Sequence, residues 1–110
     1  EITTVVQPDI SVVCDAKKLD ERGCLGAPDL VVEIVSPGTA AKDMREKQAL
    51  YETHGVKEYW IIHPLEETLM VFYRGKDKLY SRPVIYSPPD TVKVKTLKGL
   101  SVNLTDLFRE

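Results

Sequence analysis

The stretch "DLVVEIV", residues 29–35, determines how the rest of the sequence is interpreted. Five of its seven residues are aliphatic, which is the pattern of a β-strand buried on both faces. Glu33 lies inside this run. A buried carboxylate is unfavourable unless a hydrogen bond, an opposite charge or a metal ion compensates it. The stretch therefore predicts a buried strand that carries an acid with a specific partner.

The composition narrows the class of protein. The chain has 110 residues, of which 43% are hydrophobic and 29% charged, as expected for one soluble globular domain. A formal net charge of −2 gives no general attraction for nucleic acid, so an anionic partner requires a local basic patch or a metal ion. No apolar run reaches transmembrane length, which predicts no membrane partner. The two cysteines, Cys14 and Cys24, suit a reducing cytoplasm better than a disulfide.

The remaining sequence predicts strands arranged around one helix. The expected strands are 10–14, 29–35, 58–63, 68–74, 78–86 and 91–97, and the expected helix is 40–54, with Thr39 as N-cap and Gly55 after its end. Residues 15–28 are expected to form a charged loop, and the tail a helical turn capped by Thr105. This order predicts an α/β (α+β) fold, in which one mixed sheet is followed by a β-rich meander.

Strand geometry suggests a partner for Glu33. If strands 10–14 and 29–35 pair antiparallel, the start of the first lies beside the end of the second, so Asp9 comes close to Glu33. Asp29 lies about 13 Å away along the strand, at ~3.3 Å per residue, and cannot share an ion with Glu33. The alternative is that Asp9 caps a turn after Pro8 while Glu33 pairs with a lysine or arginine.

The helix adds a cation to the same region. Met44, Lys47 and Tyr51 lie on one row of the helix, which should face the sheet, and Lys47 is in the middle of that row. In the alternative interpretation, Lys47 forms an ion pair with Asp43, one turn earlier, or extends to solvent. Two carboxylates and an ammonium at one place suit metal-assisted hydrolysis of a phosphodiester. Asp9 and Glu33 would hold Mg²⁺ or Mn²⁺, and Lys47 would orient water or stabilise developing charge.

Four motifs resemble a known family. They are "QPDISVVCD" (7–15), "GAPDLVVEIVSPGT" (26–39), "DMREKQALYETHGVKEYWIIHP" (43–64) and "LSVNLTDLF" (100–108). In this order and spacing they are similar to the bacterial "putative restriction endonuclease" domain family, a branch of the PD-(D/E)XK nuclease superfamily. The similarity runs from about Val6 to Phe108. It implies a restriction-endonuclease-like fold and a Mg²⁺-dependent endonuclease that acts on DNA.

The resemblance also implies roles for individual residues. Asp9 matches the first acidic residue of the superfamily signature and Glu33 the second. The signature lysine two residues later is Val35 here, and related branches supply this lysine from the next helix, at the position of Lys47. Asp43 and Tyr51 match other recurrent positions of that helix, without assigned roles.

The chain departs from the family pattern in two places. His63 stands where members usually have aspartate, and no role follows from this change. Family members also carry a helix and a hairpin ahead of the first motif, so residues 1–110 are expected to form a single nuclease-like domain without that segment. A second hypothesis is therefore a catalytically inactive nuclease-fold module that serves binding or assembly, and a homodimer is one option for its oligomeric state.

Overall fold

A mixed five-stranded sheet forms the centre of the molecule, in the order β1-β4-β5-β6-β7. The computed structural model describes residues 8–12, 19–20, 23–24, 27–38 and 41–109. The sheet strands are β1 (Ile10–Val12), β4 (Leu30–Ile34), β5 (Glu58–His63), β6 (Thr68–Tyr73) and β7 (Val84–Tyr86). The other elements are β2 (Leu19–Asp20), β3 (Gly23–Cys24), α1 (Ala41–His54), β8 (Thr91–Lys93), β9 (Ser101–Asn103) and α2 (Leu104–Leu107). The α/β (α+β) class with a mixed sheet is confirmed.

The register of the sheet places the start of β1 beside the end of β4. The two strands are antiparallel, with Ile10 opposite Val32 and Val12 opposite Leu30, as the sequence predicts. β4 and β5 are parallel, with Glu33 opposite Ile61, and α1 makes the connection between them. Parallel neighbours need such a crossover, which forces α1 back over the sheet. Asp9 and α1 are thereby both brought toward the carboxyl end of β4.

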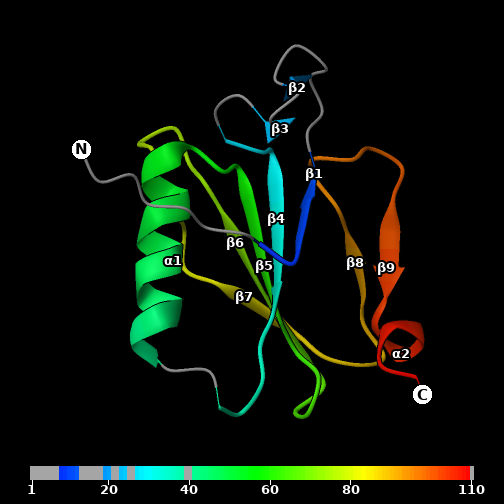
Figure 1. The fold of residues 1–110 in the computed structure, drawn as a ribbon. Coiled ribbons are helices and arrows are strands. Elements are labelled where there is room, and N and C mark those ends of the chain that lie inside the picture. Colours follow the sequence, from blue (N-terminus) through cyan, green and yellow to red (C-terminus); the bar gives the residue numbers. More distant parts are fainter. Residues whose placement is uncertain (1–7, 13–18, 21–22, 25–26, 39–40, 110) are drawn as a thin grey trace.

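Each face of the sheet has its own apolar core. α1 covers one face, and β8, β9 and α2 lie against the other (Figure 1). The core under α1 contains Val31, Tyr51, Val56, Tyr59, Ile61 and Phe72. The core on the opposite face contains Leu30, Val32, Trp60, Ile62, Leu69, Val71, Val92, Val94 and Leu104. Side chains alternate along β4 and β5, so both strands contribute to both cores, which explains their nearly continuous apolar sequence.

Several predicted boundaries are wrong. The stretch 15–28 is not all loop, because β2 and β3 pair antiparallel within it. The predicted strand 78–86 is reduced to β7, because the backbone N–H of Tyr80 donates to the Glu52 carboxylate at 2.6 Å and draws the chain toward α1. Pro83, which has no N–H to donate, precedes the short strand. Cys14 and Thr39 lie outside the described residues.

The C-terminal segment also differs from expectation. The strand predicted at 91–97 ends at Lys93 and pairs with β9, which the sequence did not suggest. The cap of α2 is Asn103 rather than Thr105, since the Asn103 side chain accepts a hydrogen bond from the Asp106 N–H at 3.0 Å. No helix within the described ranges is long and apolar enough to span a membrane.

A buried carboxylate joins the C-terminal segment to the sheet. Glu58, which is 1% exposed, accepts a hydrogen bond on Oε2 from Trp60 Nε1 at 2.7 Å. Its Oε1 accepts from the backbone N–H of Thr96 at 2.9 Å and from the Thr96 hydroxyl at 2.6 Å. The two oxygens thus connect Trp60, two positions along β5, to Thr96, which is 38 positions from Glu58 in sequence. These contacts hold the segment after β8 against the sheet.

We expect Glu58→Gln to destabilise the fold by roughly 1–3 kcal/mol, the usual effect of leaving one buried donor unsatisfied. The amide of glutamine can accept on one side only, so either the Trp60 indole or the Thr96 donors lose their acceptor. Urea denaturation measures the free energy of unfolding. Glu66→Gln, at an exposed turn position, is the matched control. Equal stability of the two variants would contradict this role of Glu58.

Candidate active site

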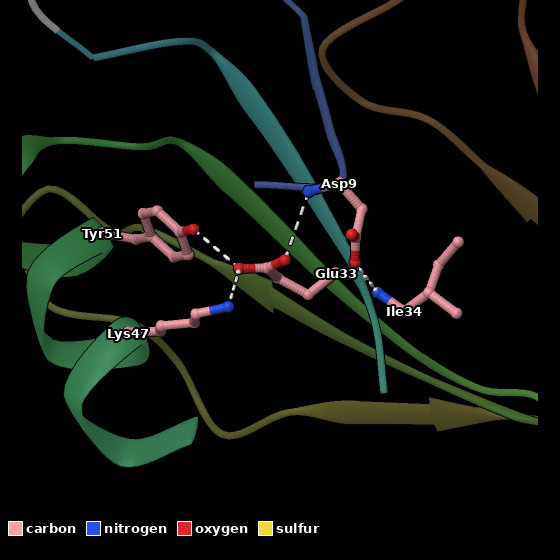
Figure 2. A network of polar contacts seen from close by, with 5 residues as sticks. All are labelled: Asp9, Glu33, Ile34, Lys47 and Tyr51. Atoms are coloured by element: carbon pink, nitrogen blue, oxygen red, sulfur yellow. Dashed lines mark hydrogen bonds and ion pairs between the residues drawn. The ribbon is translucent and has the colours of Figure 1, made fainter. Parts of the chain in front are cut away.

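Glu33 is the centre of a polar network beneath α1. It is 3% exposed and lies on the face of β4 that carries the α1 core. Its Oε2 accepts a hydrogen bond from the Tyr51 hydroxyl at 2.7 Å and pairs with Lys47 Nζ at 3.2 Å. Its Oε1 accepts a longer bond, 3.3 Å, from the backbone N–H of Asp9. Figure 2 shows the two α1 side chains approaching Glu33 from one side and Asp9 from the other.

The helical repeat explains how α1 supplies two donors. Lys47 and Tyr51 are four residues apart, so they lie on the same face of the helix, one turn from each other. Tyr51 is 5% exposed and makes an edge contact with Tyr59, with ring centroids 5.0 Å apart. Burial, together with the hydrogen bond to Glu33, raises the pKa of Tyr51 well above its usual value. Tyr51 therefore remains a neutral donor at any physiological pH.

Lys47 pairs with the strand acid rather than within its helix. Its side chain is 43% exposed, and its amine points to Glu33, as its position on the sheet-facing row predicts. The alternative ion pair with Asp43 is not among the contacts of the described residues, although Asp43 lines the same cavity. Partial exposure keeps the Lys47 amine within reach of a molecule that binds at this cavity. The catalytic role of Lys47 stays a prediction.

Asp9 links the start of β1 to the end of β4. Its Oδ2 accepts a hydrogen bond from the backbone N–H of Ile34 at 2.7 Å, while its own N–H donates to Glu33. Within the described residues, Asp9 Oδ1 makes no hydrogen bond. The contact with β4 is therefore long-range, and the alternative in which Asp9 only caps a local turn does not describe the structure. The antiparallel pairing does bring Asp9 and Glu33 together.

A cavity of about 180 Å³ opens beside these groups. Its lining consists of Asp9, Glu33, Ile34, Val35, Asp43, Met44, Lys47 and Tyr59. Val35, which directly follows β4, contributes an aliphatic side chain at the position where the superfamily signature has lysine, so the positively charged side chain in this cavity is Lys47 from α1. His63 is not among the lining residues. Asp29 lines a different cavity, where its Oδ1 pairs with Lys57 Nζ at 3.6 Å.

The donor atoms suit a small, hard divalent cation. Of the three acids that line the cavity, Asp9 and Glu33 each have one oxygen that receives at most a weak hydrogen bond from the described residues, namely Oδ1 of Asp9 and Oε1 of Glu33. The described ranges contain no cluster of three or more His, Cys, Asp or Glu side chains able to enclose a metal ion. Mg²⁺ is commonly held by one or two carboxylates, with waters and substrate phosphate as the other ligands. Asp9 and Glu33 fit that kind of site.

The sequence did not predict that the Tyr51 hydroxyl donates a hydrogen bond to Glu33. The only signal was the spacing of Tyr51 from Lys47, since a residue one turn along the sheet-facing row reaches the same strand. Nothing in that spacing distinguishes a tyrosine that packs in the core from one that also donates to a carboxylate. The structure shows that Tyr51 does both.

Known proteins resemble this chain over nearly its whole length. An uncharacterized protein of Synechocystis sp. is 27% identical over 103 residues, which cover 93% of this chain and 53% of that protein. The crystal structure of a putative nuclease belonging to DUF820, from Anabaena variabilis, superposes with a TM-score of 0.76 at 27% identity. That match covers 94% of this chain and 59% of the Anabaena protein. The chain thus spans between half and three fifths of these relatives.

Residues 2–105 match the family Uma2, described as "Putative restriction endonuclease". The match includes Asp9, Glu33, Lys47 and Tyr51, and it confirms the resemblance carried by the four sequence motifs. The TM-score of 0.76 shows that this chain shares the fold of the putative nuclease from Anabaena. The chain belongs to the Uma2 family of restriction-endonuclease-like proteins.

Proposed function

We propose that the chain is the nuclease domain of a metal-dependent DNA endonuclease. The observation that carries the proposal is the convergence on one cavity of the buried Glu33, the Asp9 carboxylate and the Lys47 amine. Family membership supports a nuclease, and DNA is the substrate class that follows from the family description. The donor set supports Mg²⁺ or Mn²⁺ as the cofactor, with Asp9 and Glu33 as ligands.

The charges in the cavity explain why a cation would be needed. The charged residues that line the cavity are Asp9, Glu33, Asp43 and Lys47, which together carry two net negative charges and repel a phosphodiester. A divalent cation between the carboxylates would cancel this negative charge, polarise the scissile phosphoryl group and acidify the attacking water. Asp9 and Glu33 hold their positions through two hydrogen bonds: the Asp9 N–H donates to the Glu33 carboxylate, and the Ile34 N–H donates to the Asp9 carboxylate. The site is therefore preorganised on two strands of the sheet.

Lys47 would act on the reacting groups rather than on the cation. Its amine can donate up to three hydrogen bonds, and the one to Glu33 leaves others for a water or a phosphate oxygen. A cation placed where negative charge develops stabilises the transition state. Its half-exposed position allows contact with a bound strand, whereas Tyr51 is closed off by burial.

A second candidate is a nuclease-fold module that binds or assembles without cleaving. The ion pair with Lys47 favours it, because that pair compensates the buried charge of Glu33 without a metal ion. The net charge of −2 also provides little general attraction for DNA. A measurement of divalent-ion binding distinguishes the two candidates. The endonuclease is expected to bind the ion, whereas the non-cleaving module does not require one.

We expect Mn²⁺ to stabilise the protein and Glu33→Gln to abolish this effect. At a free concentration about 100 times its Kd, a ligand specific for the folded state adds about 2.7 kcal/mol of stability. Differential scanning calorimetry with and without Mn²⁺ measures the gain. Glu46→Gln, an exposed acid that pairs with Lys42 on α1, is the matched control. Equal metal stabilisation of the Glu33→Gln variant would exclude Glu33 as a ligand.

We expect Lys47→Ala to reduce DNA cleavage by about 10²-fold or more while Mn²⁺ binding persists, because lysine is not a ligand. Lys42→Ala removes an exposed lysine from the same helix and should cleave at the parental rate. Adding Val35→Lys to the Lys47→Ala variant should restore part of the activity, since both positions line one cavity. Cleavage of a supercoiled plasmid is the assay. A Lys47→Ala variant as fast as the parent would refute this role.

A further inference from the structure

The hydroxyl of Tyr51 is a buried polar group that the proposed mechanism does not use. We propose that Tyr51 is a positioning residue that occupies Oε2 of Glu33, makes this carboxylate bind metal through Oε1 alone, and so favours Mg²⁺ or Mn²⁺ over Ca²⁺. The inference rests on the proposed metal site. It assigns to Tyr51 the choice of metal ion rather than a step of the reaction.

The two oxygens of Glu33 are occupied unequally. Oε2 receives both donors from α1, Tyr51 at 2.7 Å and Lys47 at 3.2 Å. From the described residues, Oε1 receives only the 3.3 Å contact of the Asp9 N–H, which is long for a hydrogen bond. A cation that approaches from the side of Asp9 therefore meets Oε1 first. It can reach Oε2 as well only if the α1 donors are displaced.

Burial makes Tyr51 the stronger constraint of the two donors. Tyr51 is 5% exposed and packs in the core with Tyr59, so its ring has little freedom to leave Glu33. The Lys47 side chain is 43% exposed and has a flexible stem, so it can exchange Glu33 for solvent or substrate. Hydrogen bonds to a charged group contribute more than neutral ones, and the Tyr51–Glu33 bond is both short and buried. Tyr51 is thus the donor that holds the carboxylate in one orientation.

A carboxylate limited to one oxygen discriminates between metal ions. Ca²⁺ takes six to eight oxygen ligands and readily accepts both oxygens of one carboxylate. Mg²⁺ requires near-octahedral geometry with short bonds and keeps several waters, so one oxygen from each carboxylate is sufficient. The Tyr51 bond therefore penalises Ca²⁺ more than Mg²⁺. Without the hydroxyl, the half-exposed Lys47 amine is the one described donor that must leave Oε2 before this oxygen can act as an additional ligand.

The test is Tyr51→Phe, which removes the hydroxyl and keeps the ring in the core. Isothermal titration of the same protein chain with Mg²⁺, Mn²⁺ and Ca²⁺ gives the Kd for each ion. We expect the Ca²⁺-to-Mg²⁺ affinity ratio to rise about tenfold, corresponding to about 1.4 kcal/mol, which is within the net range for one typical hydrogen bond. The ratio compares two ions on one variant, so a general loss of stability or of folded fraction cancels from it.

Tyr80→Phe is the matched control. The Tyr80 hydroxyl donates to the carbonyl oxygen of Val56 at 2.9 Å, and the ring stacks on Tyr59 at a centroid distance of 6.1 Å, away from Glu33. The Ca²⁺-to-Mg²⁺ affinity ratio of the Tyr80→Phe variant should equal that of the parent protein. An unchanged ratio in Tyr51→Phe, with Mg²⁺ still bound by the parent, overturns the inference and leaves the proposed function standing. A parent that binds none of the three ions overturns the metal site itself.

Discussion

The burial of one carboxylate, Glu33, is the constraint on which the site depends. An acid that is 3% exposed in an apolar core must be compensated, and the compensation comes from three groups on two separate segments. The start of β1 contributes a backbone N–H, and α1 contributes an ammonium and a hydroxyl. The groups that stabilise the acid in the fold are the same groups that give the cavity its chemistry. Structure and proposed function therefore share one set of contacts.

The topology of the sheet makes this convergence necessary. β4 and β5 are parallel, so the chain must cross over between them, and α1 is that crossover. Its first turns lie near the carboxyl end of β4, where open α/β sheets commonly bind their ligands. On the opposite face, Glu58 connects β5 to Thr96 and holds the C-terminal segment in place. Two buried acids thus point to opposite faces, one toward a cavity and one toward a structural contact.

The element that supplies the lysine has a physical consequence for the site. A lysine at position 35 would be placed by the strand that carries Glu33, whereas Lys47 is placed by the packing of α1 on the sheet. The Lys47 contact therefore depends on the aromatic core beneath the helix, in which Tyr51 meets Tyr59 edge-on. A small shift of α1 would change both donors on Oε2 of Glu33 together. The geometry of the site and the packing of the helix are coupled.

The amino-acid sequence by itself determined the fold class, the central strand around Glu33, the helix after it and the closeness of Asp9, because these follow from local periodicity and strand pairing. It also predicted which way Lys47 points, from its position on one helix row. Only the tertiary structure decided that Tyr51 donates to Glu33, that Oε1 and Oε2 differ, and that Thr96 binds Glu58. Those contacts join residues distant in sequence, and each depends on a side-chain rotamer that only the packed core selects.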